Sequence, residues 1–457
     1  MNKDVAEVSQ GYQVQTKEQG VPAGYKQTEV GVIPEDWESA CLQDVATFGG
    51  GTTPARKFFD RYYLLGTHPW VKTLDLNNSF IRNTDELVTD AALNEVSIKK
   101  HKAGSVLVAM YGGFNQIGRT GLLTVDAAIN QALVAIIPNK EKLVSEYLLF
   151  SLNFNVDYWK GVASSSRKDP NITSNDVKNY SLPLPGHKEQ TAIANALSDV
   201  DALLSELEKL IAKKQAIKTA TMQQLLTGRT RLPQFALHQD GSPKGYKQSE
   251  LGEIPEDWAI NTLSDLALIK SGGTPSTASK EYWDGNINWC TPTDITALHG
   301  QKYLKTTSRK ITEQGLLKSS ADLLPVGAIV MTSRATIGEC AITLEEVTTN
   351  QGFKNFVCNR HTNNEFLYYL LTTLKDRFIG LCSGSTFLEI STTQVRKFTV
   401  VLPELEEQTA IATILSDMDA EIQALEHRLN KTRQIKQGMM QHLLTGKTRL
   451  VKGVIND

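Results

Sequence analysis

A long helical stretch occurs twice in this 457-residue chain, and its repetition constrains the fold more than any other feature. The first copy runs from Glu189 to Leu232, and the second runs from Glu407 to Leu450. Matching residues lie 218 positions apart at both ends (407 − 189 and 450 − 232). The first copy contains no proline and reaches Gly228 without a glycine. Each copy is therefore predicted to form one long helix.

The apolar residues of both copies follow a heptad pattern. Their spacing alternates between four and three residues, as in the seam of a coiled coil. The seam residues are Ile193, Leu197, Val200, Leu204, Leu207 and Ile211 in the first copy, and Ile411, Leu415, Met418, Ile422, Leu425 and Leu429 in the second. Lys214 and Thr432 hold the next seam positions and interrupt the pattern. The shared register predicts that the two helices pair, and Gly228 and Gly446 suit the left-handed position that ends a helix.

Shorter motifs also recur and extend the repeat toward the N-terminus. Gly24-Tyr25-Lys26-Gln27 returns at Gly245-Tyr246-Lys247-Gln248, and Ile33-Pro34-Glu35-Asp36-Trp37 returns at Ile254-Pro255-Glu256-Asp257-Trp258. The offset is 221 positions in both cases (245 − 24 and 254 − 33). A long period with only two copies indicates a duplicated domain rather than a solenoid.

Between these motifs the two halves diverge. Residues 55–183 and 276–401 share only landmarks, among them the pairs Asn130-Gln131 and Asn350-Gln351. Short apolar runs such as 105–110 and 328–331 predict strands, and residues 145–153 and 365–374 predict short amphipathic helices. Each half is therefore predicted to hold a strand-rich, mixed α/β domain.

These boundaries give a domain plan in which the halves are related by a pseudo-two-fold. Its parts are an N-terminal arm (1–23), a first domain (24–186), a long central helix (187–232), a linker (233–244), a second domain (245–404), a long C-terminal helix (405–450) and a tail (451–457).

Composition excludes several other classes of protein. The formal net charge of −2 gives no sign of a nucleic-acid partner by itself. The five cysteines are scattered without a C-x-x-C pair, so we expect reduced thiols, a cytoplasmic location and no zinc site. No apolar run is long enough to predict a membrane span, and residues 1–13 lack the apolar core of a signal peptide.

The motifs of nucleotide binding and catalysis are also missing. The glycine-rich turns at 49–54 and 271–275 lack the Lys-[Ser/Thr] of a phosphate loop, and proline stands where its helix would begin. Thr445-Gly446-Lys447-Thr448 resembles the end of such a loop but follows a helix. There is no methyltransferase tetrapeptide, no H-E-x-x-H and no histidine cluster. We therefore predict no catalytic site, no metal site and no bound cofactor in this chain.

Polar and basic residues in the divergent regions are the candidate binding groups. Hydroxyl, amide and guanidinium groups on glycine-rich loops suit contacts to base edges and phosphates, although each also fits an ordinary solvated loop. The candidates are Lys72, Tyr111, Asn115, Gln116, Arg119, Ser165, Arg167 and Lys168 in the first half, and Thr291, Thr293, Ser333, Arg334, Thr336, Ser385 and Thr386 in the second.

Together these motifs resemble the specificity (S) subunits of type I restriction–modification systems. The resemblance covers Gly24 to Leu450 and rests on the doubled Ile-Pro-Glu-Asp-Trp, the Gly-Gly-Thr-Pro type of turn, and a Pro-x-x-x-Glu-Gln entry to each long helix. The first copy departs slightly, with Gly186-His187-Lys188 where the second has Glu404-Leu405-Glu406.

The resemblance implies a fold and a role. Two target-recognition domains would be separated by the long helices, which form an antiparallel coiled coil, and each domain would read one half of a bipartite site in double-stranded DNA. The chain would dock two methyltransferase (M) subunits and restriction (R) subunits. Those partners would supply the methyltransferase, nuclease and ATPase activities and use S-adenosylmethionine, ATP and Mg²⁺.

Two other functions stay open from the residues alone. A duplicated scaffold that binds protein or RNA would also use a coiled-coil spacer, whereas a self-contained nuclease would cleave DNA as the isolated chain. The low net charge suggests a further hypothesis, that the partner subunits supply much of the phosphate neutralisation.

Overall fold

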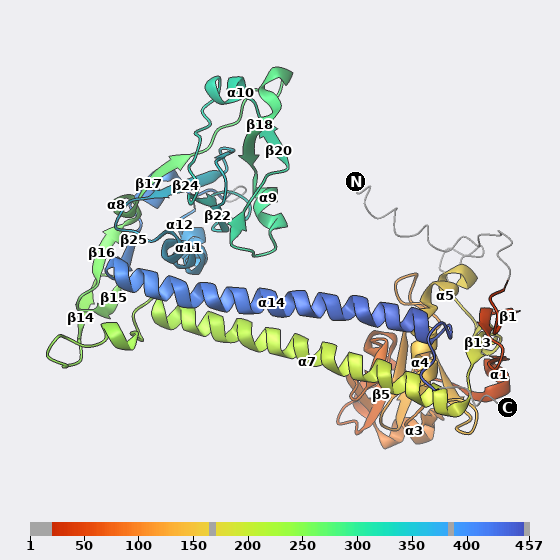
Figure 1. Cartoon of the computed structure of the whole chain (residues 1–457). Helices are drawn as coiled ribbons and strands as arrows, with labels where there is room; N and C mark the ends of the chain where they lie inside the picture. The colour runs from red at the N-terminus through yellow and green to blue at the C-terminus, as the bar shows by residue number, and fades with distance from the viewer. Residues whose placement is uncertain (1–20, 164–170, 383–387, 452–457) are drawn as a thin grey trace. The chain divides into compact units, whose positions relative to one another are not determined.

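The computed structural model describes residues 21–163, 171–382 and 388–451, and its contacts divide the chain into two compact units. Unit 1 holds the chain up to Leu207 together with the chain from Arg428, and unit 2 holds Glu208–His427. Each unit contains one strand-rich domain and a part of both long helices (Figure 1). We call residues 24–186 domain 1 and residues 245–404 domain 2.

Domain 1 is built on two sheets and two small strand pairs. The five-stranded sheet has the order β4 (Ala46–Gly50), β12 (Leu133–Pro138), β9 (Val106–Ala109), β10 (Thr120–Leu123) and β6 (Ser79–Ile81). The four-stranded sheet has the order β7 (Glu86–Val88), β5 (His68–Val71), β11 (Ala127–Ile129) and β8 (Lys100–His101). The pairs are β1 (Tyr25–Thr28) with β2 (Gly31–Pro34), and β13 (Ser181–Leu184) with β3 (Glu38–Cys41).

The central strands of domain 1 are buried on both faces. Val106 and Val134 face one apolar cluster, whereas Leu107 and Leu133 face another. This explains why these strands are continuous apolar runs rather than alternating ones. The short helices of domain 1 are α1 (Leu42–Val45), α2 (Phe59–Tyr62), α3 (Asp90–Glu95), α4 (Ser145–Phe154), α5 (Val156–Ala163) and α6 (Ser174–Lys178), with 3-10 turns η1 (Arg56–Phe58) and η2 (Thr73–Asp75).

Domain 2 repeats this plan. Its five-stranded sheet has the order β17 (Ala267–Ser271), β24 (Phe353–Cys358), β21 (Ile329–Thr332), β22 (Cys340–Thr343) and β19 (Tyr303–Leu304). The second sheet has the order β20 (Arg309–Ile311), β18 (Trp283–Cys290) and β23 (Val347–Thr349). The pairs are β14 (Tyr246–Ser249) with β15 (Gly252–Pro255), and β16 (Ala259–Thr262) with β25 (Thr399–Leu402).

The helices of domain 2 occupy corresponding places in the chain. They are α8 (Leu263–Leu266), α9 (Pro292–Ala297), α10 (Glu313–Leu317), α11 (Asn364–Thr373), α12 (Lys375–Leu381) and α13 (Thr392–Arg396), with the 3-10 turn η4 (Lys280–Tyr282), whereas the 3-10 turn η3 (Pro233–Phe235) precedes the domain. The mixed α/β duplication predicted from the sequence is therefore the observed fold.

The two long helices are α7 (His187–Leu225) and α14 (Leu405–Leu443), each of 39 residues. Both end three residues before the glycine of their Leu-Thr-Gly motif, so the predicted helical stretches to Leu232 and Leu450 include a terminal turn. Gly228 and Gly446 take φ of +70° and +69°, as predicted for the left-handed position after a helix.

The segment predicted as a linker, 233–244, is folded against domain 2. It contains η3 and a bridge between Leu237 and Pro243, and His238 lies 2.9 Å from a carboxylate oxygen of Glu256. The predicted linker is therefore a folded connection that contacts domain 2.

Candidate nucleic-acid interface

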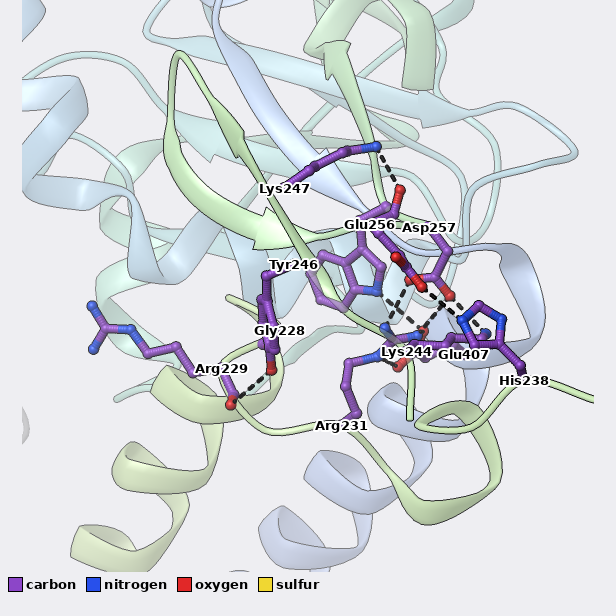
Figure 2. A network of polar contacts seen from close by, with 11 residues as sticks. Gly228, Arg229, Arg231, His238, Lys244, Tyr246, Lys247, Glu256, Asp257 and Glu407 are labelled. Atoms are coloured by element: carbon purple, nitrogen blue, oxygen red, sulfur yellow. Dashed lines mark hydrogen bonds and ion pairs between the residues drawn. The ribbon is translucent and has the colours of Figure 1, made fainter. Parts of the chain in front are cut away.

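The end of α7 is joined to domain 2 by a buried ion cluster (Figure 2). The Arg231 guanidinium donates two hydrogen bonds to Glu407, both of 2.7 Å, and two to Asp257, of 2.8 and 3.0 Å. The Trp258 indole donates to the same Glu407 at 3.2 Å, and Lys244 lies 2.7 Å from Asp257. Burial disfavours the charged form of Asp257, but the bonds from Arg231 and Lys244 outweigh it and lower its pKa to about 2.

The end of α14 makes the same cluster with domain 1. Arg449 donates to Glu189 through two bonds of 2.7 Å and to Asp36 through bonds of 2.8 and 2.7 Å. The Trp37 indole donates to Glu189 at 3.0 Å. Hydrogen bonds from Arg449 lower the pKa of Asp36, and the two carboxylates raise the pKa of Arg449. We call the two clusters the unit 1 and unit 2 junctions.

The glycine after each long helix belongs to its junction. The hydroxyl of Tyr246 donates to the Gly228 carbonyl at 3.1 Å, and the hydroxyl of Tyr25 donates to the Gly446 carbonyl at 3.1 Å. A Cβ on Gly446 would collide with the ring of Pro34. The recurring Gly-Tyr, Ile-Pro-Glu-Asp-Trp and Leu-Thr-Gly motifs are therefore parts of one contact, which explains why they repeat together.

The glutamine at the start of each long helix also bonds to its own domain. Gln190 accepts from the Val144 amide at 2.9 Å and donates to the carbonyls of Lys142 and Pro185, both at 2.9 Å. Gln408 is bonded in the same way to residues 361, 363 and 403. Each buried carboxamide therefore connects the turn before its long helix, through the carbonyl of Pro185 or Pro403, with the loop that precedes α4 or α11.

Within each unit the segments of α7 and α14 run antiparallel. In unit 2, Lys214 pairs with Glu421 at 2.7 Å, and Lys218 pairs with Asp419. In unit 1, Lys436 pairs with Asp201 at 2.6 Å. The seam interruption at Lys214 is thus occupied by an interhelical ion pair.

The predicted seam residues lie mostly in the interior of their units. Eight of the twelve are buried: Ile193, Leu197, Leu207, Ile211, Ile411, Leu415, Ile422 and Leu429. The other four are half-buried: Val200, Leu204, Met418 and Leu425.

A further polar cluster connects domain 2 to α14. The Lys302 ammonium, 5 % exposed, lies 2.8 Å from the Ser416 hydroxyl and 3.2 Å from both Tyr369 and Glu365. The Tyr369 hydroxyl donates to Asp419 at 2.6 Å. In domain 1 the corresponding helix, α4, carries Phe150, and the Lys436 ammonium lies 5.6 Å from the centre of its ring. Domain 2 therefore has the more polar attachment to its helices.

Each domain also contains the same pair of interlocked turns. In domain 1, Thr52 donates its amide to Ile129, and Trp70 donates its indole N–H to the Thr52 carbonyl at 3.2 Å. In domain 2, Gly273 donates its amide to Thr349, and Trp289 donates to the Gly273 carbonyl at 2.9 Å. These turns are the glycine-rich motifs of the sequence, and they serve as strand-to-loop connections.

Four of the domain 1 candidates share one loop between β9 and β10. Tyr111 and Asn115 are exposed, Gln116 is half-buried, and Arg119 donates to the Asn115 carbonyl at 3.0 Å. Lys72 follows β5 of the other sheet and is neutralised by ion pairs with Asp85 and Glu86. The remaining three, Ser165, Arg167 and Lys168, lie outside the described residues.

The domain 2 candidates are less uniform. Arg334 is exposed and pairs with Glu389 at 2.9 Å. Thr291 begins α9 by capping it with Asp294, and Thr293 is exposed on that helix. Thr336 is half-buried.

Ser333 is fully buried, so its predicted surface contact is not available from this position. The reason is that Ser333 continues β21 and occupies the place of Met110, since Ile390 donates to Ser333 as Ile172 donates to Met110. The last two candidates, Ser385 and Thr386, lie outside the described ranges.

The family comparison identifies the chain. The model of the type I restriction modification DNA specificity domain matches residues 34–219 and again residues 255–436, well over half of the sequence. The chain belongs to the type I restriction–modification specificity family. Its two matched segments cover most of each domain and the adjoining parts of both long helices.

Relatives support the same family. The chain is 26% identical over 438 residues to the putative type I restriction enzyme MjaX specificity subunit of Methanocaldococcus jannaschii, covering 93% of this chain and 97% of that protein. It is 39% identical over 176 residues to the MjaIX specificity subunit of the same organism, covering 38% of this chain and 40% of the relative. The crystal structure of a type I S subunit from M. genitalium shares the fold, with a TM-score of 0.54, 15% identity, and coverage of 89% and 96%.

In this specificity chain the sequence does not reveal the arginines that form the two junctions. Arg231 and Arg449 were not singled out, although the repeated Thr-Arg-Leu after each Leu-Thr-Gly placed an arginine at the same position twice. Among the described residues there is no group of three His, Cys, Asp or Glu side chains that could hold a metal ion. No described helix is long and apolar enough to cross a membrane.

Proposed function

We propose that this specificity chain reads a bipartite site in double-stranded DNA, with one domain for each half-site. Its long helices would set the distance between the two half-sites. The supporting observation is the doubled junction. Domain 1 holds the start of α7 and the end of α14, and domain 2 holds the end of α7 and the start of α14. The corresponding Arg–Glu pairs make these contacts, Arg449 with Glu189 in unit 1 and Arg231 with Glu407 in unit 2. Rigid attachment at both ends is what a fixed spacing between two half-sites requires.

The exposed β9–β10 loop, with Tyr111, Asn115 and Arg119, supplies groups suited to base edges in domain 1. Arg334 supplies a guanidinium at the corresponding loop of domain 2. These loops differ between the domains, so the two half-sites are expected to differ in sequence. Double-stranded DNA would be read without a cofactor bound by this chain.

The partners in this proposal are two methyltransferase (M) subunits and restriction (R) subunits in the cytoplasm. They would bring S-adenosylmethionine, ATP and Mg²⁺. Exposed apolar residues on α7 support docking of a partner helix. Leu210 and Ile217 of unit 2 lie seven residues apart and are 38 % and 42 % exposed, so they share one side of the helix.

The docking proposal is tested by a double variant, Leu210→Lys with Ile217→Lys. It should keep its helix content and lose copurification with the methyltransferase subunits. The matched control is Ala212→Lys, on the far side of the same helix. Normal copurification of the double variant would contradict docking at this face.

The reading function is tested by mapping methylated positions in DNA from cells that express the chain with its partner subunits. We expect one bipartite sequence with a constant gap. Exchange of residues 24–185 for the corresponding domain of another specificity subunit should change one half-site only. A change in both half-sites, or no sequence-specific methylation, would contradict the proposal.

A further inference from the structure

One exposed side-chain contact is identical in the two otherwise divergent domains. The hydroxyl of Thr53 donates to the carboxamide oxygen of Gln131, and the hydroxyl of Thr274 donates to that of Gln351. Gln131, Thr274 and Gln351 are exposed, and Thr53 is half-buried. We call each pair a Thr–Gln clasp. An exposed hydrogen bond adds little stability, so folding alone does not account for its presence in both domains.

The backbone beneath each clasp is held in the same way. Gly51 and Gly272 lie so close to the carbonyls of Asn130 and Asn350 that a Cβ would collide with them. The side chains of Asn130 and Asn350 accept from the backbone two residues later, at 3.1 and 2.9 Å. Each glutamine therefore projects from a rigid turn, which fixes the direction in which it can bind.

A guanidinium lies beside the same tryptophan in both domains, although it comes from different places in the chain. Arg56, from η1, lies 5.7 Å from the ring centre of Trp70, whereas Arg309, from β20, lies 5.1 Å from that of Trp289. These are the tryptophans whose indole N–H groups bond to the glycine turn of the clasp. Two unrelated sequence positions thus place a guanidinium at the same structural location, and the Arg56 guanidinium also pairs with Glu86 at 2.7 Å.

The donors that remain on the clasp favour an anionic ligand. The carboxamide oxygen is engaged by threonine, whereas Nε2 of Gln131 and of Gln351 makes no hydrogen bond with other residues in the described ranges. A glutamine that reads adenine uses its oxygen and its nitrogen together. With the oxygen engaged, the clasp offers two N–H donors, which match the acceptor oxygens of a phosphate.

We propose that the Thr–Gln clasps of both domains, each with its neighbouring arginine, bind phosphates of the DNA backbone and so fix how each domain sits on its half-site. This inference rests on the proposed function. A group shared by both domains cannot distinguish two different half-sites, but it can bind the backbone that both have in common. The divergent loops then read the bases from a fixed position.

The test uses the complex of this chain with its methyltransferase subunits. Gln131→Glu and Gln351→Glu are made singly and together. Glutamate still accepts the threonine hydroxyl, so the clasp persists, but the N–H donors are replaced by a negative charge. Gln131→Ala and Gln351→Ala remove the donors without adding charge. Gln423→Glu, at an exposed glutamine of α14, is the control for an added charge.

Dissociation constants are measured at one salt concentration, on a duplex with the mapped site and on a duplex without it. Each glutamate variant should weaken binding about tenfold on both duplexes, and each alanine variant somewhat less. Gln423→Glu should bind like the unaltered complex. The methylated sequence should stay the same in every variant.

Three results would overturn the inference. Unchanged affinity in the double glutamate variant would show that the clasps do not contact DNA. An altered half-site would make the glutamines base readers. Loss of copurification with the methyltransferase subunits, without DNA, would place the clasps against a protein. The unaltered complex distinguishes failure of the proposed function from failure of the clasp inference. If the unaltered complex methylates no bipartite site, the proposed function is contradicted, whereas the clasp inference is contradicted only by the variants.

Discussion

Arg231→Leu should destabilise unit 2 strongly, because it leaves a buried carboxylate without its cation. The Arg231 side chain is 7 % exposed and that of Glu407 is 4 % exposed. Removal of one partner from a buried ion pair costs about 3–5 kcal/mol. In unit 1 the Arg449 side chain is 29 % exposed, so water replaces part of the lost contact. Arg449→Leu should therefore cost less, about 1–3 kcal/mol.

The effect of Arg231→Leu should depend on pH. The junction lowers the pKa of Asp257 from 3.8 to about 2, which corresponds to about 2 kcal/mol of stability. A carboxylate with a depressed pKa contributes this stability above its unfolded pKa and loses it as the pH falls through the folded value. The difference between the variant and the unaltered chain should therefore shrink between about pH 4 and pH 2.

Native-state hydrogen exchange is the suitable assay, because it reports on each unit separately where unfolding of the whole chain need not be two-state. Arg231→Leu should lower protection at the start of α14 and in β15, and Arg231→Lys should lower it less, since lysine keeps the charge but not the paired geometry. Arg229→Leu is the control, because only the backbone carbonyl of Arg229 takes part in the network. Equal protection in Arg231→Leu and Arg229→Leu would refute the role of the junction.

Two further predictions concern the long helices. Lys214→Leu should stabilise the helix pair by about 0.5–1 kcal/mol, because a seam leucine gains more than the partly exposed Lys214–Glu421 ion pair provides, and a lower denaturation midpoint would contradict this. Gly446→Ala should cost about 1–3 kcal/mol, because φ is positive and its Cβ meets Pro34. Gly438→Ala, in open space within α14, should instead gain about 0.5–1 kcal/mol, and similar effects of the two changes in thermal unfolding would contradict the capping role.

The duplicated fold was predictable because its signal is periodic or repeated. The heptad seam marked both long helices, and the constant offsets marked the two domains. The junctions were only partly predictable from the sequence. Trp37 and Trp258 repeat at the constant offset, but the carboxylates that accept from their indoles lie 152 and 149 residues away in the chain. No local pattern connects Arg449 with Asp36, which are 413 residues apart.

The candidate binding residues were less predictable, for a related reason. Side-chain type alone does not separate a loop residue from the end of a strand, so buried Ser333 and exposed Arg334 looked alike in the sequence. Lys72 looked like a free cation because Asp85 and Glu86, which neutralise it, belong to another strand and its loop. Gln131 and Gln351 were noticed as landmarks, but their bonds to threonine required the folded turns.

The central claim is that the long helices set the gap between two independently read half-sites. It is tested most directly by deleting one heptad from each helix, residues 204–210 of α7 with residues 427–433 of α14, and mapping methylated DNA from cells that contain the partner subunits. Removal of seven residues shortens a helix by about 10 Å, which is about three base pairs. We expect both half-site sequences to persist with a gap shorter by that amount. A changed half-site with an unchanged gap would contradict the account.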